Sequence, residues 1–192
     1  KEIEEIMSTE GEVRGTTLKT DEGFVLREAG EEGIKKAEEE LEKMGYPLKY
    51  SEINGMDFYP LGMRALSIIA ISKALNFDEK KIIEMGVSAP RGSLLIKFFM
   101  KYFLSIEKTF AKAGEMWNKH YTVGDLKPVD VNIKGRIVTL HLTGVKLHPI
   151  FCKYLVGYFS SVGKMVVQKE VVADESKCYF KGDDFHEFNL RW

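Results

Sequence analysis

The chain has 192 residues, 44% of them hydrophobic, and its 28 Lys and Arg nearly balance its 29 Asp and Glu, which leaves a net charge of −1. A chain of this size can bury one good core, so we expect one domain with an extension. The charge balance excludes a basic field for nucleic acid or an anionic membrane surface. The longest apolar stretches, around 66–75 and 94–104, are shorter than a membrane span. Two cysteines are too few for a secreted disulfide scaffold, so we expect a cytoplasmic protein.

The first fifty residues read as an extension of the main domain, which we place at 51–192. A charged lead-in is followed by two strand-like stretches, 12–18 and 24–27, around the turn composition Thr20-Asp-Glu-Gly23. A helix is then predicted over 28–44, where Gly45 and Pro47 form a stop signal. Its buried stripe is narrow and consists of Ile34, Ala37 and Leu41.

Three helices are predicted next. Pro60 opens one that runs to about residue 75, and Asp78 can cap a short one over 79–85 that ends at Gly86. After a break at 89–92, Ser93 can cap the longest helix of the chain, 94–119.

The longest helix is apolar nearly all round over 94–106, which predicts burial in the middle of the fold. Its aromatic stripe either packs the core, which is the simpler interpretation, or lines in part an apolar cavity for a small hydrophobic or aromatic molecule. The sequence leaves both open. The candidate ligand-binding residues are Phe99, Tyr102, Phe103, Phe110, Trp117 and His120.

After His120, hydrophobic residues recur at every second position, as in a β-strand with one buried face. Strands are predicted over 121–133 and 136–145 with a tight turn at Lys134-Gly135. A helix over 149–163, a strand over 165–172 and a terminal hairpin follow. Helices followed by hairpin-linked strands predict an α+β fold with an antiparallel sheet, in the order strand-strand-helix-strands.

The C-terminal part holds both cysteines together with a glutamate and a histidine, at Cys152, Glu175, Cys178 and His186. Thiolate, carboxylate and imidazole are the ligands that zinc prefers in closed structural sites. A three-residue loop over 181–183 would place Cys178 opposite His186 and pair Lys177 with Glu187. Glu175 lies three residues before Cys178, which is the wrong face of a straight strand, so it must sit in a bend. The alternative is that both cysteines are core residues and that Glu175 and His186 lie on the surface.

The pattern Cys-x22-Glu-x2-Cys-x7-His, with Gly182, Asp183 and Phe188 near its end, resembles the 4-vinyl reductase domain family. That family covers bacteriochlorophyll 4-vinyl reductase-like proteins and the sensory domains of phenol-responsive activators. The resemblance implies a structural zinc ion on Cys152, Glu175, Cys178 and His186, although zinc-binding members usually have cysteine at the last position. It also implies a helical layer on an antiparallel sheet, similar to haem nitric-oxide sensors, and dimerisation through helices.

Motifs for dinucleotides, P-loop phosphates, serine hydrolysis and zinc proteases are absent from the sequence, and no carboxylate pair is marked out by spacing. The first hypothesis is therefore a ligand-sensing module with an apolar pocket and a structural zinc ion. A tetrapyrrole 4-vinyl reductase, or an accessory factor to one, is the alternative that the family name implies, and a homodimeric adaptor is the third. Whether the protein is an enzyme stays open at this point.

Overall fold

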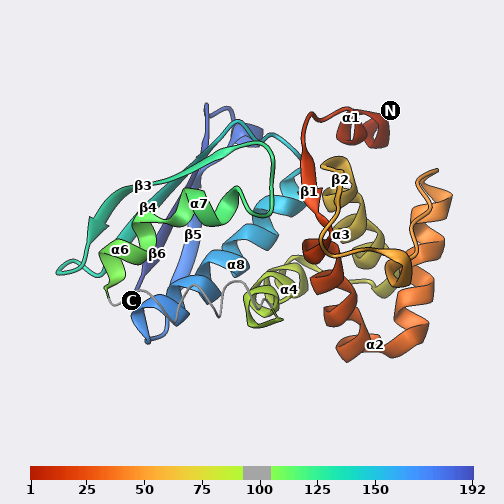
Figure 1. Cartoon of the computed structure of the whole chain (residues 1–192), viewed down its shortest axis with the longest axis horizontal. Helices are drawn as coiled ribbons and strands as arrows, with labels where there is room; N and C mark the ends of the chain where they lie inside the picture. Colours follow the sequence, from red (N-terminus) through yellow and green to blue (C-terminus); the bar gives the residue numbers. More distant parts are fainter. Residues whose placement is uncertain (93–104) are drawn as a thin grey trace.

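A computed structural model describes residues 1–92 and 105–192, with side chains described through residue 90 and from residue 105 onward. Helices α1 to α3 occupy one end of the molecule, a four-stranded antiparallel sheet with α6, α7 and α8 occupies the other, and α4 lies between them against α8 (Figure 1). The predicted α+β class and the order strand-strand-helix-strands are confirmed.

The N-terminal half is more helical than the sequence suggests. Helix α1 (Glu2–Met7) leads into strand β1 (Glu12–Arg14), which pairs antiparallel with β2 (Phe58–Pro60). Helix α2 (Gly15–Lys43) follows directly and bends at Gly30. The short helix η1 (Tyr50–Glu52) and helix α3 (Gly62–Leu75) complete this end.

The predicted turn and strand between residues 20 and 27 are wrong, because this stretch lies inside α2. Leu18, Asp21, Phe24 and Val25 are all buried and recur at helical spacing. Asp21 looks like a turn residue in the sequence, but in the fold Arg64 of α3 neutralises its charge in the interior. Tertiary pairing thus overrides the local turn signal. The predicted stripe of Ile34, Ala37 and Leu41 is buried as expected.

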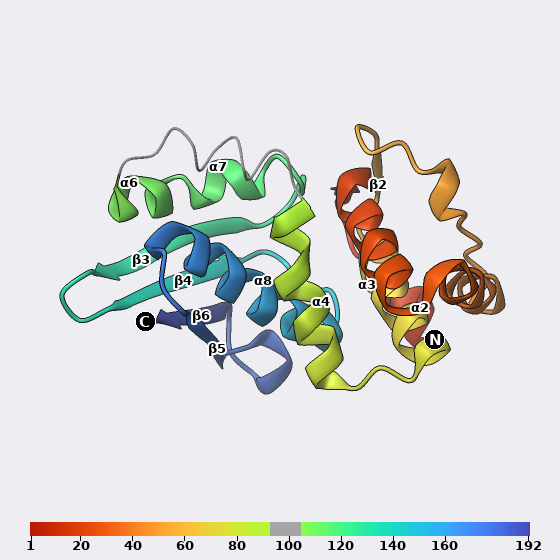
Figure 2. The same cartoon turned by 90° about the horizontal axis from the view of Figure 1, so that it is seen from below.

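Helix α4 (Glu79–Gly92) continues past Gly86, where the sequence predicts a stop, and past Pro90. Gly86 instead allows α4 to cross helix α8 (Pro149–Val167) at close range (Figure 2). A Cβ atom at Gly86 would lie 2.0 Å from the carbonyl oxygen of Tyr154, and one at Gly157 would lie 1.9 Å from that of Ile83. Both glycines serve helix packing rather than helix termination.

The predicted helix over 94–119 is wrong for its second half, and residues 93–104 lie outside the described residues. Helix α6 (Ile106–Ala111) begins at Ser105, whose hydroxyl accepts a hydrogen bond from the Lys108 amide. Lys112 then leaves helical geometry, and the short helix α7 (Ala113–Trp117) follows.

The sheet contains β3 (Asp125–Asn132), β4 (Ile137–Thr143), β5 (Val172–Lys177) and β6 (His186–Arg191) in the order β3-β4-β6-β5. The short helix η2 (Tyr179–Lys181) lies in the β5–β6 connection. The predicted strand over 165–172 is wrong, because α8 runs on to Val167 and ends at Gln168, which adopts the left-handed conformation. The side chains of one sheet face, among them Val138, Leu140, Leu142, Phe188 and Leu190, are buried in the core.

Among the described helices, α8 alone is long and apolar enough to span a membrane by length and composition, and half of its apolar window is buried in the fold. The core helix of a soluble protein has the same properties.

Candidate metal centre and apolar cavity

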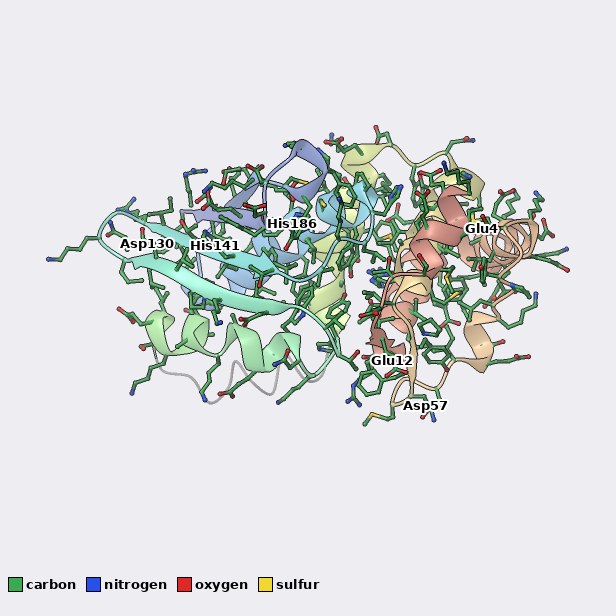
Figure 3. All side chains as sticks on the ribbon, turned by 90° about the horizontal axis from the view of Figure 1, so that it is seen from above. Glu4, Glu12, Asp57, Asp130, His141 and His186 are labelled. Atoms are coloured by element: carbon green, nitrogen blue, oxygen red, sulfur yellow. The ribbon has the colours of Figure 1, made fainter. Side chains whose placement is uncertain are left out.

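The four residues that the sequence singles out as metal ligands meet at one point of the fold. Cys152 comes from the first turn of α8, Glu175 from β5, Cys178 from the residue after β5, and His186 from the start of β6. One ligand atom from each side chain lies within 4.8 Å of all the others. The cluster is buried near one end of the sheet, where Figure 3 labels His186.

A β-bulge in β5 explains how Glu175 and Cys178, three positions apart, point to the same face of the strand. The register pairs Glu175 with Phe188 and Lys177 with Glu187, so Ser176 is an extra residue in β5. The predicted pair of Lys177 with Glu187 is therefore present, and the bend predicted at Glu175 is a bulge inside the strand. An extra residue shifts the alternation of faces, so Glu175 and Cys178 both point toward α8 although they are three positions apart.

The distances within the cluster suit four ligands around one small cation. The Cys152 sulfur lies 3.9 Å from the Cys178 sulfur and 3.8 Å from Nδ1 of His186. Ligand atoms of a tetrahedral transition-metal ion lie roughly 3.3–3.8 Å apart. Nδ1 of His186 is 2.8 Å from Oε1 of Glu175, so this pair would separate slightly around an ion.

A hydrogen bond from Nε2 fixes the imidazole ring of His186 so that Nδ1 points into the cluster. Nε2 donates a hydrogen bond to the carbonyl oxygen of Val145, at 3.0 Å. Metal-bound histidines commonly donate their second N–H to a carbonyl oxygen, which fixes the ring and directs the remaining nitrogen at the ion.

The electrostatics of the cluster favour a cation. Burial raises the pKa of the Cys152 thiol, and the Glu175 carboxylate raises it further. Burial also raises the pKa of Cys178. For Glu175, burial is outweighed by the hydrogen bond and charge of His186, which hold the pKa of the carboxyl below its ordinary value. Two thiols that resist ionisation beside a carboxylate would become thiolates in the field of a bound metal ion. With four protein ligands, such an ion would have no open position for a reacting water.

A separate apolar cavity lies between α6, α7, α8 and one face of the sheet, with a volume of about 70 Å³. Its lining is aliphatic and aromatic apart from the hydroxyl groups of Thr109 and Tyr158. The lining residues are Thr109, Phe110, Ala113, Met116, Trp117, Leu126, Leu140, Tyr158, Phe159, Val162, Val166 and Leu190.

The predicted ligand-binding residues divide into three groups. Phe110 and Trp117 line the cavity. His120 does not; it is buried with Nδ1 3.5 Å from the hydroxyl of Thr16. Phe99, Tyr102 and Phe103 lie outside the described residues. The indole N–H of Trp117 donates to the carbonyl oxygen of Val123, at 2.8 Å, so it supports the fold rather than a guest.

Sequence reasoning missed the contribution of α8 to the cavity. Tyr158, Phe159, Val162 and Val166 recur at helical spacing along this helix, a signal that indicates a buried face but not what it faces. The packing of α8 against α6 and α7 turns this face into a cavity wall.

No known family profile matches the chain, and no curated protein matches its sequence. Solved structures do match its fold. An H-NOX protein from S. oneidensis in the Fe(II)NO ligation state has a TM-score of 0.70 and 12% identity, over 93% of this chain and 98% of that one. The chain has the H-NOX fold.

Two further H-NOX structures match over 93% of this chain. An oxygen-binding H-NOX domain related to soluble guanylate cyclases has a TM-score of 0.63 and 12% identity over 93% of its own length. A mutant of the T. tengcongensis H-NOX protein has a TM-score of 0.61 and 14% identity over 95% of its length. The predicted likeness to haem nitric-oxide sensors is thereby confirmed at the level of fold.

The prediction of zinc as the cofactor is wrong. The structural neighbours are iron and haem proteins: one is described in its Fe(II)NO state, and others concern haem distortion and haem redox potential. Thiolate, imidazole and carboxylate ligands suit several transition metals, so neither these ligand types nor the family resemblance identifies the ion.

The described part of this chain does not fit a haem either. A cavity of about 70 Å³ is less than half of a cavity of roughly 150 Å³ that holds benzene, and a haem is several times larger than benzene. Haem iron takes histidine, cysteine, methionine or tyrosine, and of these the described cavity lining has only Met116 and Tyr158. Burial raises the pKa of Tyr158, which opposes phenolate ligation. All four histidines are engaged elsewhere: His120 at Thr16, His141 at Glu187, His148 at the start of α8, and His186 in the cluster.

Proposed function

We propose that the protein is a ligand-sensing module that encloses a small apolar molecule in the cavity between α6, α7, α8 and the sheet. The observation that carries this proposal is the cavity itself, which is lined by mainly apolar side chains from α6, α7, α8 and three strands of the sheet. Well-packed interiors have few voids larger than a water molecule, so a space of this size beside two short helices indicates a binding site. Helices α6 and α7 have six and five residues, so a small shift of either would enlarge the space.

The metal cluster supports the same proposal as a structural element. Cys152, Glu175, Cys178 and His186 would hold one divalent transition-metal ion, which would join the first turn of α8 to β5 and β6. Helix α8 forms one wall of the cavity, and β6 contributes Leu190 to another. By joining α8 to β6, the ion would fix the position of these two walls relative to each other. A cytoplasmic location belongs to this proposal, because free thiols persist in a reducing compartment.

The four motif residues that carry the resemblance to the 4-vinyl reductase domain family meet in the fold. No family profile matches the chain, so the resemblance enters this proposal only through the sensory members of that family, which suit it best. The vinyl reductase alternative requires room for a porphyrin, which the cavity does not offer. The homodimeric adaptor has little support, since the most exposed apolar side chains, Met56, Val129 and Val172, lie on different elements.

The proposal is tested by titrating methyl-labelled protein with xenon and following the methyl resonances of Met116, Leu126, Leu140 and Leu190. We expect saturable shifts in the wild-type protein and none in Ala113→Leu, which fills the cavity. Val129→Leu adds bulk at an exposed position and serves as the matched control, so it should bind as the wild type does. Absence of shifts in the wild type would contradict the proposal.

A further inference from the structure

The sequence contains one Asn-Gly pair, Asn54-Gly55, and it lies in the turn between η1 and β2. The amide of Asp57 donates a hydrogen bond of 3.2 Å to the carbonyl oxygen of Asn54, which closes a four-residue turn. Asn54 is exposed and Gly55 is half-buried. The carboxamide of Asn54 is therefore open to water, and the residue that follows it has no side chain.

The side chain of Asn54 is folded back over this turn. Its Oδ1 accepts a hydrogen bond from the Met56 amide, at 3.0 Å. Met56 lies two residues further along the chain, so this bond holds the side-chain carbonyl beside the peptide group of Gly55, the residue in between. The N–H of Gly55 itself donates to no acceptor among the described residues, so no hydrogen bond competes for it.

We propose that Asn54 is a site of spontaneous deamidation in the native protein. The nitrogen of Gly55 loses its proton to water and attacks Cγ of Asn54. A bond between this nitrogen and Cγ forms, the bond between Cγ and Nδ2 breaks, and Nδ2 takes up protons from water and leaves as ammonia. The product is a cyclic imide, which water opens at either of its two carbonyl carbons. Opening at Cγ gives aspartate, and opening at the main-chain carbonyl carbon gives isoaspartate.

Three features of the turn favour this reaction. The attacking and attacked groups belong to neighbouring residues, so their encounter costs little entropy. The N–H of Met56, already bound to Oδ1 of Asn54, stabilises the negative charge that develops on this oxygen during the attack. Gly55 has no Cβ atom, so its main chain can adopt the conformation that ring closure requires. The reaction is independent of the apolar cavity and of what that cavity binds.

The two products should differ in stability, because this turn caps the start of α2. The carbonyl oxygen of Gly55 accepts a hydrogen bond from the Thr16 amide at 3.0 Å, and that of Asp57 accepts one from the Gly15 amide at 2.8 Å. Isoaspartate lengthens the main chain before Gly55 and would displace its carbonyl from Thr16. Aspartate keeps the main chain and adds a negative charge near the N-terminus of α2, which is favourable.

The test is made on the whole native chain, with Asn132 as an internal control. Asn132 is also exposed, and its Oδ1 also accepts a hydrogen bond from a main-chain amide, that of Gly135 at 2.7 Å. It is followed by Ile133, whose branched side chain crowds the attacking nitrogen. After incubation at neutral pH, mass spectrometry of proteolytic peptides measures deamidation at both positions. We expect the rate at Asn54 to exceed that at Asn132 by about 10-fold or more, which corresponds to about 1.4 kcal/mol of activation free energy.

Gly55→Ala should slow the reaction and bring the rate at Asn54 close to that at Asn132. The added Cβ atom would meet a methyl group of Thr16 at 3.3 Å, and this side chain can move aside, so the variant should fold. Circular dichroism checks the fold of the variant. If it does not fold, the comparison of Asn54 with Asn132 in the wild-type protein decides.

Equal rates at Asn54 and Asn132 in the wild type would overturn the proposal. An Asn54 that stays intact in the native protein, while it is converted in the urea-unfolded chain, would show that the turn blocks the reaction and would overturn it as well. Chromatography separates the aspartyl and isoaspartyl proteins, and we expect the isoaspartyl form to unfold at the lower temperature. Equal unfolding temperatures of the two forms would overturn the effect on α2.

Discussion

His186 and Glu175 share a hydrogen bond of 2.8 Å between Nδ1 and Oε1, at the point where two cysteine sulfurs also converge. The other ring nitrogen of His186 is bound to the Val145 carbonyl oxygen, so the ring cannot turn away. Glu175 reaches it because of the bulge at Ser176. Both residues are thus positioned by features of the backbone, a carbonyl oxygen for His186 and a bulge for Glu175.

Replacing Cys178 by serine should release the proposed metal ion and lower the stability of the fold, because metal binding and folding are coupled. Elemental analysis for first-row transition metals, on protein purified without a histidine tag, measures the first effect, and denaturant unfolding measures the second. Asp184→Asn removes an exposed charge from the same β5–β6 connection and should change neither. Metal-free wild-type protein with the same unfolding midpoint before and after metal addition would contradict the structural role.

Replacing Gly157 by alanine should destabilise the protein by at least about 1–3 kcal/mol, the usual effect of overpacking. The added Cβ would lie 1.9 Å from the backbone oxygen of Ile83, which cannot move without displacing α4. Gly23→Ala in α2 is the matched control, since its Cβ would meet only the Arg27 side chain at 3.7 Å. This control should raise the free energy of unfolding by about 0.5–1 kcal/mol. Equal effects of the two substitutions would show that the α4–α8 crossing is looser than described.

The stability of the protein should fall as the pH is lowered from 6.5 to 4, because of His120. Burial, with the nearby charges of Arg14 and Lys119, lowers the pKa of His120 to about 4 from its ordinary 6.5. The unfolded chain therefore binds a proton in this range that the folded protein excludes, and up to about 3 kcal/mol of stability is lost by pH 4.

His120→Gln should remove the part of this pH dependence that His120 causes, as followed by urea unfolding at several pH values. A chelator in all samples removes any bound metal ion, and the loss that the lowered pKa of Glu175 causes on acidification is common to both proteins. Identical slopes of stability against pH in the variant and the wild type would show that His120 does not cause the loss.

Replacing Asp21 by asparagine should destabilise the protein by about 3–5 kcal/mol, since the charge of Arg64 would remain buried without a counter-ion. Asp21→Leu/Arg64→Met should recover most of this loss, because neither charge is then present. Thermal unfolding of the single and double variants measures both effects. If the double variant is no more stable than Asp21→Asn, the unpaired charge of Arg64 is not the cause of the loss.

The sequence by itself determined the fold class and which four side chains of metal-ligand type lie together. Period-two hydrophobicity from residue 121 onward follows from one buried sheet face, and the spacing of Cys152, Glu175, Cys178 and His186 was sufficient to select residues that meet in the fold. It also placed Phe110 and Trp117 on a buried stripe, since helical spacing is a local property.

Only the tertiary structure decided what the buried aromatic stripe faces and how the four side chains of the cluster come together. Gly86 appeared to be a helix end because its contact with α8 is not local. Asp21 appeared to belong to a turn because its partner Arg64 is 43 residues away. The facing of Glu175 depends on a bulge that arises from pairing with β6, and the cavity exists only where α6, α7 and α8 cover one sheet face. Each of these features depends on contacts between residues distant in the chain, and a pattern of neighbouring residues does not encode such contacts.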